Sequence, residues 1–329
     1  MATVAIGERG RAVVARPSVD RRLLRAFLER DRLLAAYAIC DLDEREFPRT
    51  RWAVATSGDE VIAAGVEYSG VTPQPLFVMG RTEGIAAILR DVLRPRVAYI
   101  AAMPDAVAAI SGLYRLDSGP PMIRMWVDRA RFRATPAPVE RLLPVQVTEL
   151  NRLYQLGFAA WLPSTAIDEG LYYGIRVNGK LVAAAGTHVI SRDARLAVVG
   201  NVLTHVEHRG RGYATAVTGA VTAELLRSCD QVVLNVRSDN PPAIQAYRKL
   251  GFAEHVRFEE RLMRRASSPL ADLAAPLLRW LADRSAPPAH AIPGALPAHQ
   301  AYRASTIDDP STHDPTMPGP AAATTEEPR

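Results

Sequence analysis

The part of this sequence best suited to chemistry is a glycine-containing loop, Arg209–Ala214, that joins an apolar stretch to a helical one. The first N–H groups of a helix have no partner inside the helix, and the helix dipole adds positive character there. Gly210 and Gly212 let the backbone approach an anion closely. Arg209 and Arg211 add two cations. The residues alone therefore predict a cradle for a phosphate or pyrophosphate group.

Two common nucleotide loops do not fit this segment. The dinucleotide pattern GxGxxG needs a third glycine that GRGYAT lacks, and the pattern GxxxxGK[ST] is absent from the chain. The loop instead resembles the acyl-CoA loop of the GNAT superfamily of N-acetyltransferases, whose pattern is [QR]-x-x-G-x-[GA]. Arg209, Gly212 and Ala214 occupy its three specified positions.

A second motif follows in the order that this superfamily has. Its pattern is N-x-x-A-[IL]-x-x-Y-x-[KR]-x-G-F, and residues 240–252 read NPPAIQAYRKLGF. The specified positions are filled by Asn240, Ala243, Ile244, Tyr247, Lys249, Gly251 and Phe252. Together the two motifs extend the resemblance over roughly residues 144–265.

The resemblance implies an α/β (α+β) fold in which helices flank a mixed, mostly antiparallel central sheet. The first half of the chain alternates helical and strand patterns without a glycine loop. It resembles the degenerate first half of a tandem GNAT protein, and we expect it to wall the acceptor site. The expected segments are a flexible N-terminus at 1–19, a degenerate GNAT-like α/β domain at 20–130, a linker at 131–143, an N-acetyltransferase domain at 144–265 and a Pro/Ala-rich, mostly disordered tail at 266–329.

Hydrophobic periodicity and turn signals predict the individual elements. Helices are expected from about Asp20 and at 82–92, 106–113, 147–156, 213–227 and 242–250. Strands are expected at 52–55, 61–68, 74–79, 97–102, 122–127, 172–177, 181–190, 196–204, 231–236 and 258–263.

The resemblance also implies a donor site for acetyl-CoA. In the superfamily the strand before the loop leaves its neighbour, so that its backbone pairs with the pantetheine arm, and the loop N–H groups hold the pyrophosphate. A hydroxyl at the helix start and an asparagine amide add contacts. The residues implied are Val202, Leu203, Thr204, Arg209, Gly210, Arg211, Gly212, Tyr213, Ala214, Thr215 and Asn240.

The reaction needs residues for two proton transfers, a general acid and a general base. Spacing alone makes Tyr247 an amphipathic core residue, whereas the resemblance makes it the general acid that protonates the departing thiolate. The strand GNVLTH carries no acidic residue, so the sequence does not identify the general base. Glu169 is our candidate, with Asp168, His188, His205 or a water chain as alternatives. Residues 158–163 are expected to cover the acceptor pocket.

Composition limits the other classes of function. The net charge of +5 comes almost entirely from arginines scattered among acidic residues, which favours no nucleic-acid partner. No apolar run approaches the roughly 18 residues of a membrane span, and no signal segment is visible, so we expect a cytoplasmic protein without membrane contact. Cys40 and Cys229 lack metal-ligand spacing, and we expect no metal.

The sequence thus predicts an N-acetyltransferase that moves the acetyl group of acetyl-CoA to a primary amine by direct attack in a ternary complex. The acceptor is a small molecule or a peptide that carries the amine. The sequence allows a homodimer but does not decide the oligomeric state. The alternative is a non-catalytic, regulatory module that binds acyl-CoA. The absence of an acidic residue from the strand GNVLTH favours this alternative. Cofactor binding without turnover would distinguish it.

Overall fold

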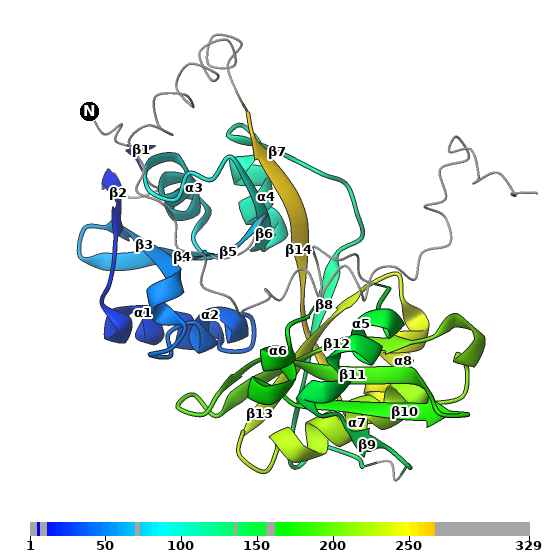
Figure 1. Ribbon diagram of the computed structural model, residues 1–329. Helices are drawn as coiled ribbons and strands as arrows, with labels where there is room; N and C mark the ends of the chain where they lie inside the picture. The colour runs from blue at the N-terminus through cyan, green and yellow to red at the C-terminus, as the bar shows by residue number, and fades with distance from the viewer. Residues whose placement is uncertain (1–4, 7–11, 70–72, 135–136, 156–161, 267–329) are drawn as a thin grey trace, which may run out of the picture.

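The computed structural model describes residues 5–6, 12–69, 73–134, 137–155 and 162–266, which form a mixed α/β structure (Figure 1). The strands are β1 (Ala5–Ile6), β2 (Ala12–Pro17), β3 (Thr50–Ser57), β4 (Glu60–Tyr68), β5 (Gln74–Gly80), β6 (Val97–Ala102), β7 (Tyr114–Leu116), β8 (Met122–Asp128), β9 (Glu140–Arg141), β10 (Tyr172–Val177), β11 (Lys180–Ser191), β12 (Leu196–Thr204), β13 (Gln231–Arg237) and β14 (Ala253–Arg265). The helices are α1 (Arg21–Leu28), α2 (Ala36–Cys40), α3 (Thr82–Asp91), α4 (Pro104–Ile110), α5 (Val147–Leu153), α6 (Ser164–Glu169), α7 (Tyr213–Leu225) and α8 (Pro241–Lys249). None of the described helices is long and apolar enough to cross a membrane.

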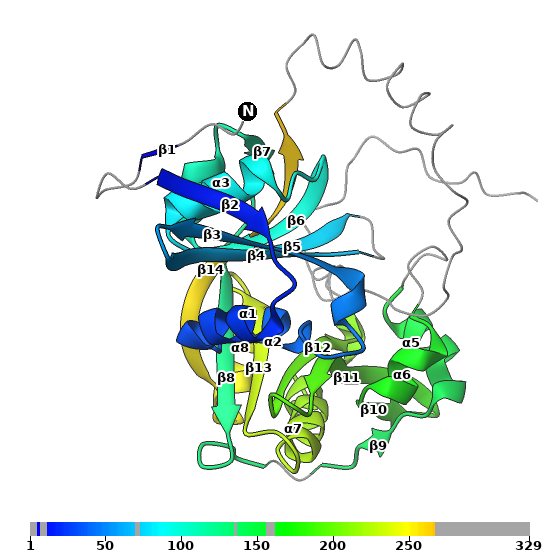
Figure 2. The ribbon, with the colours of Figure 1, turned by 90° about the vertical axis from the view of Figure 1, so that its left-hand side faces the viewer.

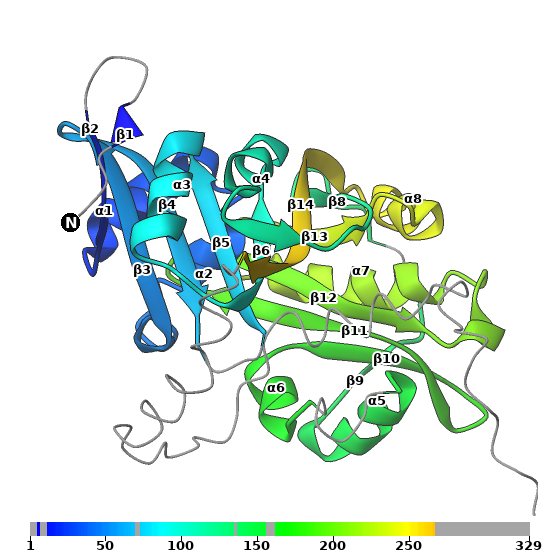
Figure 3. The ribbon, with the colours of Figure 1, turned by 90° about the horizontal axis from the view of Figure 1, so that it is seen from above.

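The strands pair in one continuous order, β1-β2-β3-β4-β5-β6-β14-β8-β13-β12-β11-β10-β9, with β7 beside β14. Neighbouring strands are antiparallel except for the pairs β5–β6 and β12–β13. The predicted α/β class with a mostly antiparallel sheet is therefore confirmed. Helices α3 and α4 cover one face of the first half, and α7 covers β10, β11 and β12 in the second (Figure 3).

Three large apolar cores hold these layers together. One lies between α3, α4 and the first half of the sheet, and another between α7, α8 and the second half. Between the halves, α1 and α2 form a third core with both halves of the sheet (Figure 2). There Leu24 and Ile39 are fully buried, and their cluster joins Trp52 of β3 to Leu196 and Val233 of the second half. Burial of this shared surface fixes the two halves against each other.

The halves also exchange strands. Strand β8, from the first half of the chain, pairs along its whole length with β13 of the second. Strand β14, the last of the chain's second half, pairs with β8 over 253–258 and then with β6 over 259–264. The expected domains 20–130 and 144–265 are therefore not separate sheets, and their boundaries stay a prediction.

Two short strands correct details of the expected layout. Residues 12–17, expected within a flexible N-terminus, form β2 and pair with β3. Only Val13 of β2 is buried, so this strand lacks the alternation of buried and exposed residues from which a two-residue period is recognised. The expected linker 131–143 contains β9, whose two residues pair with β10. The expected tail beyond Ala266 lies outside the described residues.

Candidate functional site

An opening between the parallel strands β12 and β13 forms the centre of the site. The two strands pair only where Leu196–Val199 run beside Gln231–Leu234. Beyond that point β12 remains bonded to β11 as far as Thr204, while β13 remains bonded to β8 as far as Arg237. The strands therefore diverge, and a cavity of about 770 Å³ lies at the divergence.

A bulge in β12 accompanies the divergence. Two residues of β12, Asn201 and Val202, stand opposite one residue of β11. Asn201 has a φ of 54°, in the left-handed region, and is only 3% exposed. The hydroxyl of Tyr154 donates to the backbone oxygen of Asn201 at 2.5 Å. Such a β-bulge, in which an extra residue bends one strand, is frequently found next to binding sites.

The glycine loop forms one wall of this cavity. Gly210 and Gly212 have φ values of 76° and 78°, which favour glycine, and a Cβ atom added at either would meet nothing within 4 Å. Helix α7 begins directly after Gly212, and no side chain caps its N-terminus. The first N–H groups of the helix are thus available to an anion beside open space, as the residues predicted.

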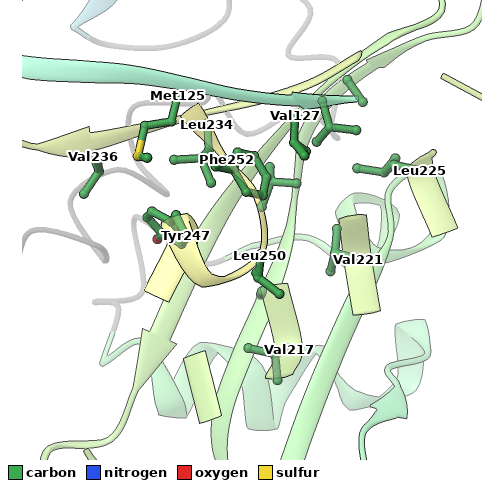
Figure 4. Packing of buried hydrophobic residues seen from close by; sticks show 14 of the residues in the cluster. Met125, Val127, Val217, Val221, Leu225, Leu234, Val236, Tyr247, Leu250 and Phe252 are labelled. Atoms are coloured by element: carbon green, nitrogen blue, oxygen red, sulfur yellow. The ribbon is translucent and has the colours of Figure 1, made fainter. Parts of the chain in front are cut away.

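Helix α8 forms another wall of the cavity. The side-chain oxygen of Asn240 accepts from the N–H of Ala243 at 3.2 Å and so caps this helix, which leaves the amide nitrogen as the donor toward the cavity. Tyr247 also lines the cavity and is only 6% exposed. The centre of its ring lies 6.1 Å from that of Phe252 (Figure 4). Burial raises the pKa of Tyr247, so its hydroxyl stays protonated and able to donate.

Most of the residues implied for the donor site gather around this cavity. Those that line it are Val202, Thr204, Arg209, Gly210, Gly212, Tyr213, Ala214, Thr215, Asn240 and Tyr247. Leu203 instead packs its side chain into the core beneath α5, and Arg211 is exposed outside the lining. The cavity also has polar atoms that were not predicted. Thr204 Oγ1 and Asn235 Oδ1 are buried and, among the described residues, have no hydrogen-bond partner.

A second cavity of about 310 Å³ lies between the two halves of the chain. It shares three lining residues with the first, namely His188, Asn201 and Asn235, so the two cavities meet at the bulge. Helix α2 of the first half forms part of its wall. Glu169, the candidate base, lines this second cavity rather than the first, and it forms an ion pair with Arg45.

A chain of hydrogen-bonded side chains crosses the junction of the cavities. The Asn201 amide nitrogen donates to the Tyr172 hydroxyl at 2.7 Å, and its oxygen lies 3.1 Å from His188 Nε2. That arrangement places the proton of His188 on Nε2, so Nδ1 accepts from the Tyr37 hydroxyl at 2.5 Å. Burial lowers the pKa of His188 to about 4. The ring is therefore neutral at pH 7 and fully engaged, which makes it a poor general base.

Two glycines in the sheet make room for this chain. A Cβ atom on Gly200 would lie 2.0 Å from His188 Nε2. One on Gly186 would lie 2.2 Å from the ring of Tyr172. Glycine inside a strand can thus mark the close approach of a neighbouring group.

One cluster among the described residues has the composition of a metal site. The ligand atoms of His205, Glu207 and His208 lie within 4.8 Å of one another in the turn before the glycine loop. The expected absence of a metal stays a prediction.

Comparison with known proteins gives this geometry a family. The family model of the GNAT acetyltransferases matches residues 140–252, which carry the diverging strands, the glycine loop and α8. This part of the chain is a GNAT acetyltransferase domain. The predicted resemblance is confirmed by that match.

Solved structures extend the likeness beyond the GNAT domain. A GCN5-related N-acetyltransferase from Sphaerobacter thermophilus shares 16% identity and a TM-score of 0.52, covering 79% of this chain and 97% of that one. A protein from Drosophila shares 10% identity and a TM-score of 0.55, covering 77% and 98%. A tandem GNAT protein from the clavulanic acid biosynthesis pathway shares 18% identity and a TM-score of 0.49, covering 78% and 99%. Since the first two likenesses span both halves, the fold they share includes the half that precedes the GNAT domain.

Proposed function

We propose that this protein transfers the acetyl group of acetyl-CoA to a primary amine by direct attack in a ternary complex. The observation that carries the proposal is the opening between β12 and β13, which joins an uncapped helix N-terminus to a buried tyrosine within one cavity. A pyrophosphate would bind the first N–H groups of α7, and the pantetheine arm would lie between the diverging strands. The unpartnered oxygens of Thr204 and Asn235 are where polar groups of that arm would bind.

The acceptor amine would enter through the second cavity and meet the thioester at the shared bulge. Because the thioester is already activated, the protein needs only to orient the reactants, polarise the carbonyl through backbone N–H groups and manage protons. The amine nitrogen forms a bond to the carbonyl carbon, and the carbon–sulfur bond then breaks. Tyr247 donates its proton to the departing thiolate and recovers one from the nitrogen of the tetrahedral intermediate.

An acetylation assay tests this function directly. Purified protein is incubated with acetyl-CoA and a panel of primary amines, and free thiol is measured over time. We expect amine-dependent thiol release. Tyr247→Phe should lower kcat by about 100-fold or more, as loss of a general acid does, with acetyl-CoA affinity within about twofold. Tyr114→Phe, at a buried tyrosine of the first half, is the control and should keep full turnover.

Two results would contradict the proposal at different points. Tight acetyl-CoA binding without turnover on any amine would favour a binding module over an enzyme. Full turnover in Tyr247→Phe would remove this hydroxyl from the mechanism and leave the reaction standing.

A further inference from the structure

Strand β14 carries a carboxylate into the second cavity. Glu260 lies in the part of β14 that pairs with β6, opposite Ala101, and its side chain lines that cavity. Successive residues of a strand point to opposite faces. The neighbouring Glu259 accordingly lies outside the lining and forms an ion pair with Arg261.

The Glu260 carboxylate is held in an unusual state. Its Oε2 atom is buried and has no hydrogen-bond partner among the described residues. A buried acceptor without a partner is costly, and such groups in folded proteins call for a functional explanation. Burial raises the pKa of Glu260 to about 7, although Arg124 and Arg261 act in the opposite direction. The group can therefore gain and lose a proton near neutral pH.

Groups from other elements face Glu260 without neutralising it. Arg124 of β8 is fully buried, donates to the backbone oxygen of Leu33 at 3.0 Å and lies 5.4 Å from the ring centre of Tyr37. No ion pair joins Arg124 to Glu260 within the described residues. Tyr37 of α2 is itself bonded to His188 at the junction of the two cavities. Charge interactions link Glu260 to both Arg124 and Tyr37, so it lies near the polar side chains that lead to that junction.

The rest of the second cavity also favours a cation. Its walls carry the acidic residues Asp41, Asp43, Glu46, Glu169 and Glu260 and the basic residues Arg45, Arg49 and Arg124. Arg45 is paired with Glu169, and Arg49 lies 3.7 Å from Glu46. Burial raises the pKa of Asp41 and of Asp43, and Asp43 lies 3.9 Å from Arg25. Among the described residues, Asp41 and Glu260 are the acidic residues of this lining that have no ion pair, and a positively charged ligand would pair with them.

We infer that Glu260 binds the ammonium group of the acceptor amine and accepts its proton before attack. This role rests on the acetyl transfer proposed above, and it supplies the general base that the central strand lacks. The ammonium gives one proton to the Glu260 carboxylate and becomes a free amine. That amine attacks the thioester, and Glu260 later releases its proton to solvent. Glu169 is less suited to the task because its carboxylate is already paired with Arg45.

The test compares Glu260→Gln with Glu259→Gln across a range of pH. Glutamine keeps the shape of glutamate but cannot accept the proton. We expect kcat/KM of the wild type to fall below a pH of about 7, the pKa of Glu260. Glu260→Gln should lose about 100-fold at pH 7.5. The kcat/KM of Glu260→Gln should recover as pH rises toward the pKa of the amine. Without a base, this variant can use only amine that has already lost its proton in solution, and that fraction grows with pH. Glu259→Gln should match the wild type throughout.

Acetyl-CoA affinity and melting temperature, measured for all three proteins, separate loss of folding from loss of chemistry. A folded Glu260→Gln protein with wild-type activity and an unchanged pH profile would overturn the role of Glu260 and leave acetyl transfer intact. Lost activity that no rise in pH restores would also overturn it, because it would indicate a structural role. A wild type that binds acetyl-CoA but acetylates no amine would overturn acetyl transfer itself, and this role with it.

Discussion

The two halves of the molecule contain the same kind of junction and use it differently. In each half a strand with a parallel neighbour leads into a helix: β5 beside β6 leads into α3, and β12 beside β13 leads into α7. In the first half a single residue, Arg81, separates strand from helix. In the second half residues 205–212 intervene, and they include both left-handed glycines of the loop.

The glycines of the two junctions show what the difference means. A Cβ atom on Gly80 would lie 2.3 Å from the backbone oxygen of Ile62, and one on Gly84 would lie 2.7 Å from Ala63 Cβ. In the first half, therefore, glycine lets α3 pack directly on the sheet. Gly210 and Gly212 meet nothing within 4 Å. At the first junction, neighbouring protein atoms occupy the space beside the glycines. At the second junction, that space is open to a ligand.

The largest expected effect concerns the independence of the halves. Expression of residues 1–135 and 136–329 as separate chains should give two proteins without a cooperative fold. The first would lack β14, which lies between β6 and β7, and the second would lack β8, which lies between β13 and β14. Circular dichroism and the dispersion of amide NMR signals measure this. Mixing the two chains should restore structure, whereas a well-dispersed spectrum from either half alone would contradict the exchange of strands.

A second effect separates the open junction from the filled one. Gly212→Glu should lower acetyl-CoA affinity at least about 100-fold in a calorimetric titration, because it puts a bulky anion where the pyrophosphate would bind. Gly179→Glu is a matched control. Gly179 has a φ of 76°, close to the 78° of Gly212, and is equally open, but it lies in the turn between β10 and β11. Equal losses in both variants would point to backbone strain rather than to a ligand site.

The sequence was informative where function depends on a short continuous segment. The loop Arg209–Ala214 and the motif at 240–252 predicted the GNAT domain, because helix N-termini and glycine conformations are local properties. Elements with a clear period were also placed within a few residues. The final strand, expected at 258–263, extends over 253–265 because its ends pair with two different partners.

The second cavity could not be predicted in the same way, because its residues come from distant parts of the chain. Tyr37 and Glu260 meet only through the exchange of strands, and the run FEERLMRR around Glu260 is typical of a solvated surface. One signal was available. Gly200-Asn201 interrupts an apolar strand, and a glycine in that position often marks a bulge.

The smallest expected effect tests the filled junction. Gly84→Ala should reduce the free energy of unfolding by about 1–3 kcal/mol, as overpacking of a core does, because its Cβ would press on Ala63. Acetyl-CoA affinity should stay within about twofold, since the first half would bind no donor of its own. Gly112→Ala, where a Cβ atom meets nothing within 4 Å, is the control for stability. Urea unfolding and calorimetry on the same samples measure both quantities. If Gly84→Ala weakened acetyl-CoA binding while Gly112→Ala did not, the first junction would have to be included in the donor site, and the contrast between the halves would fail.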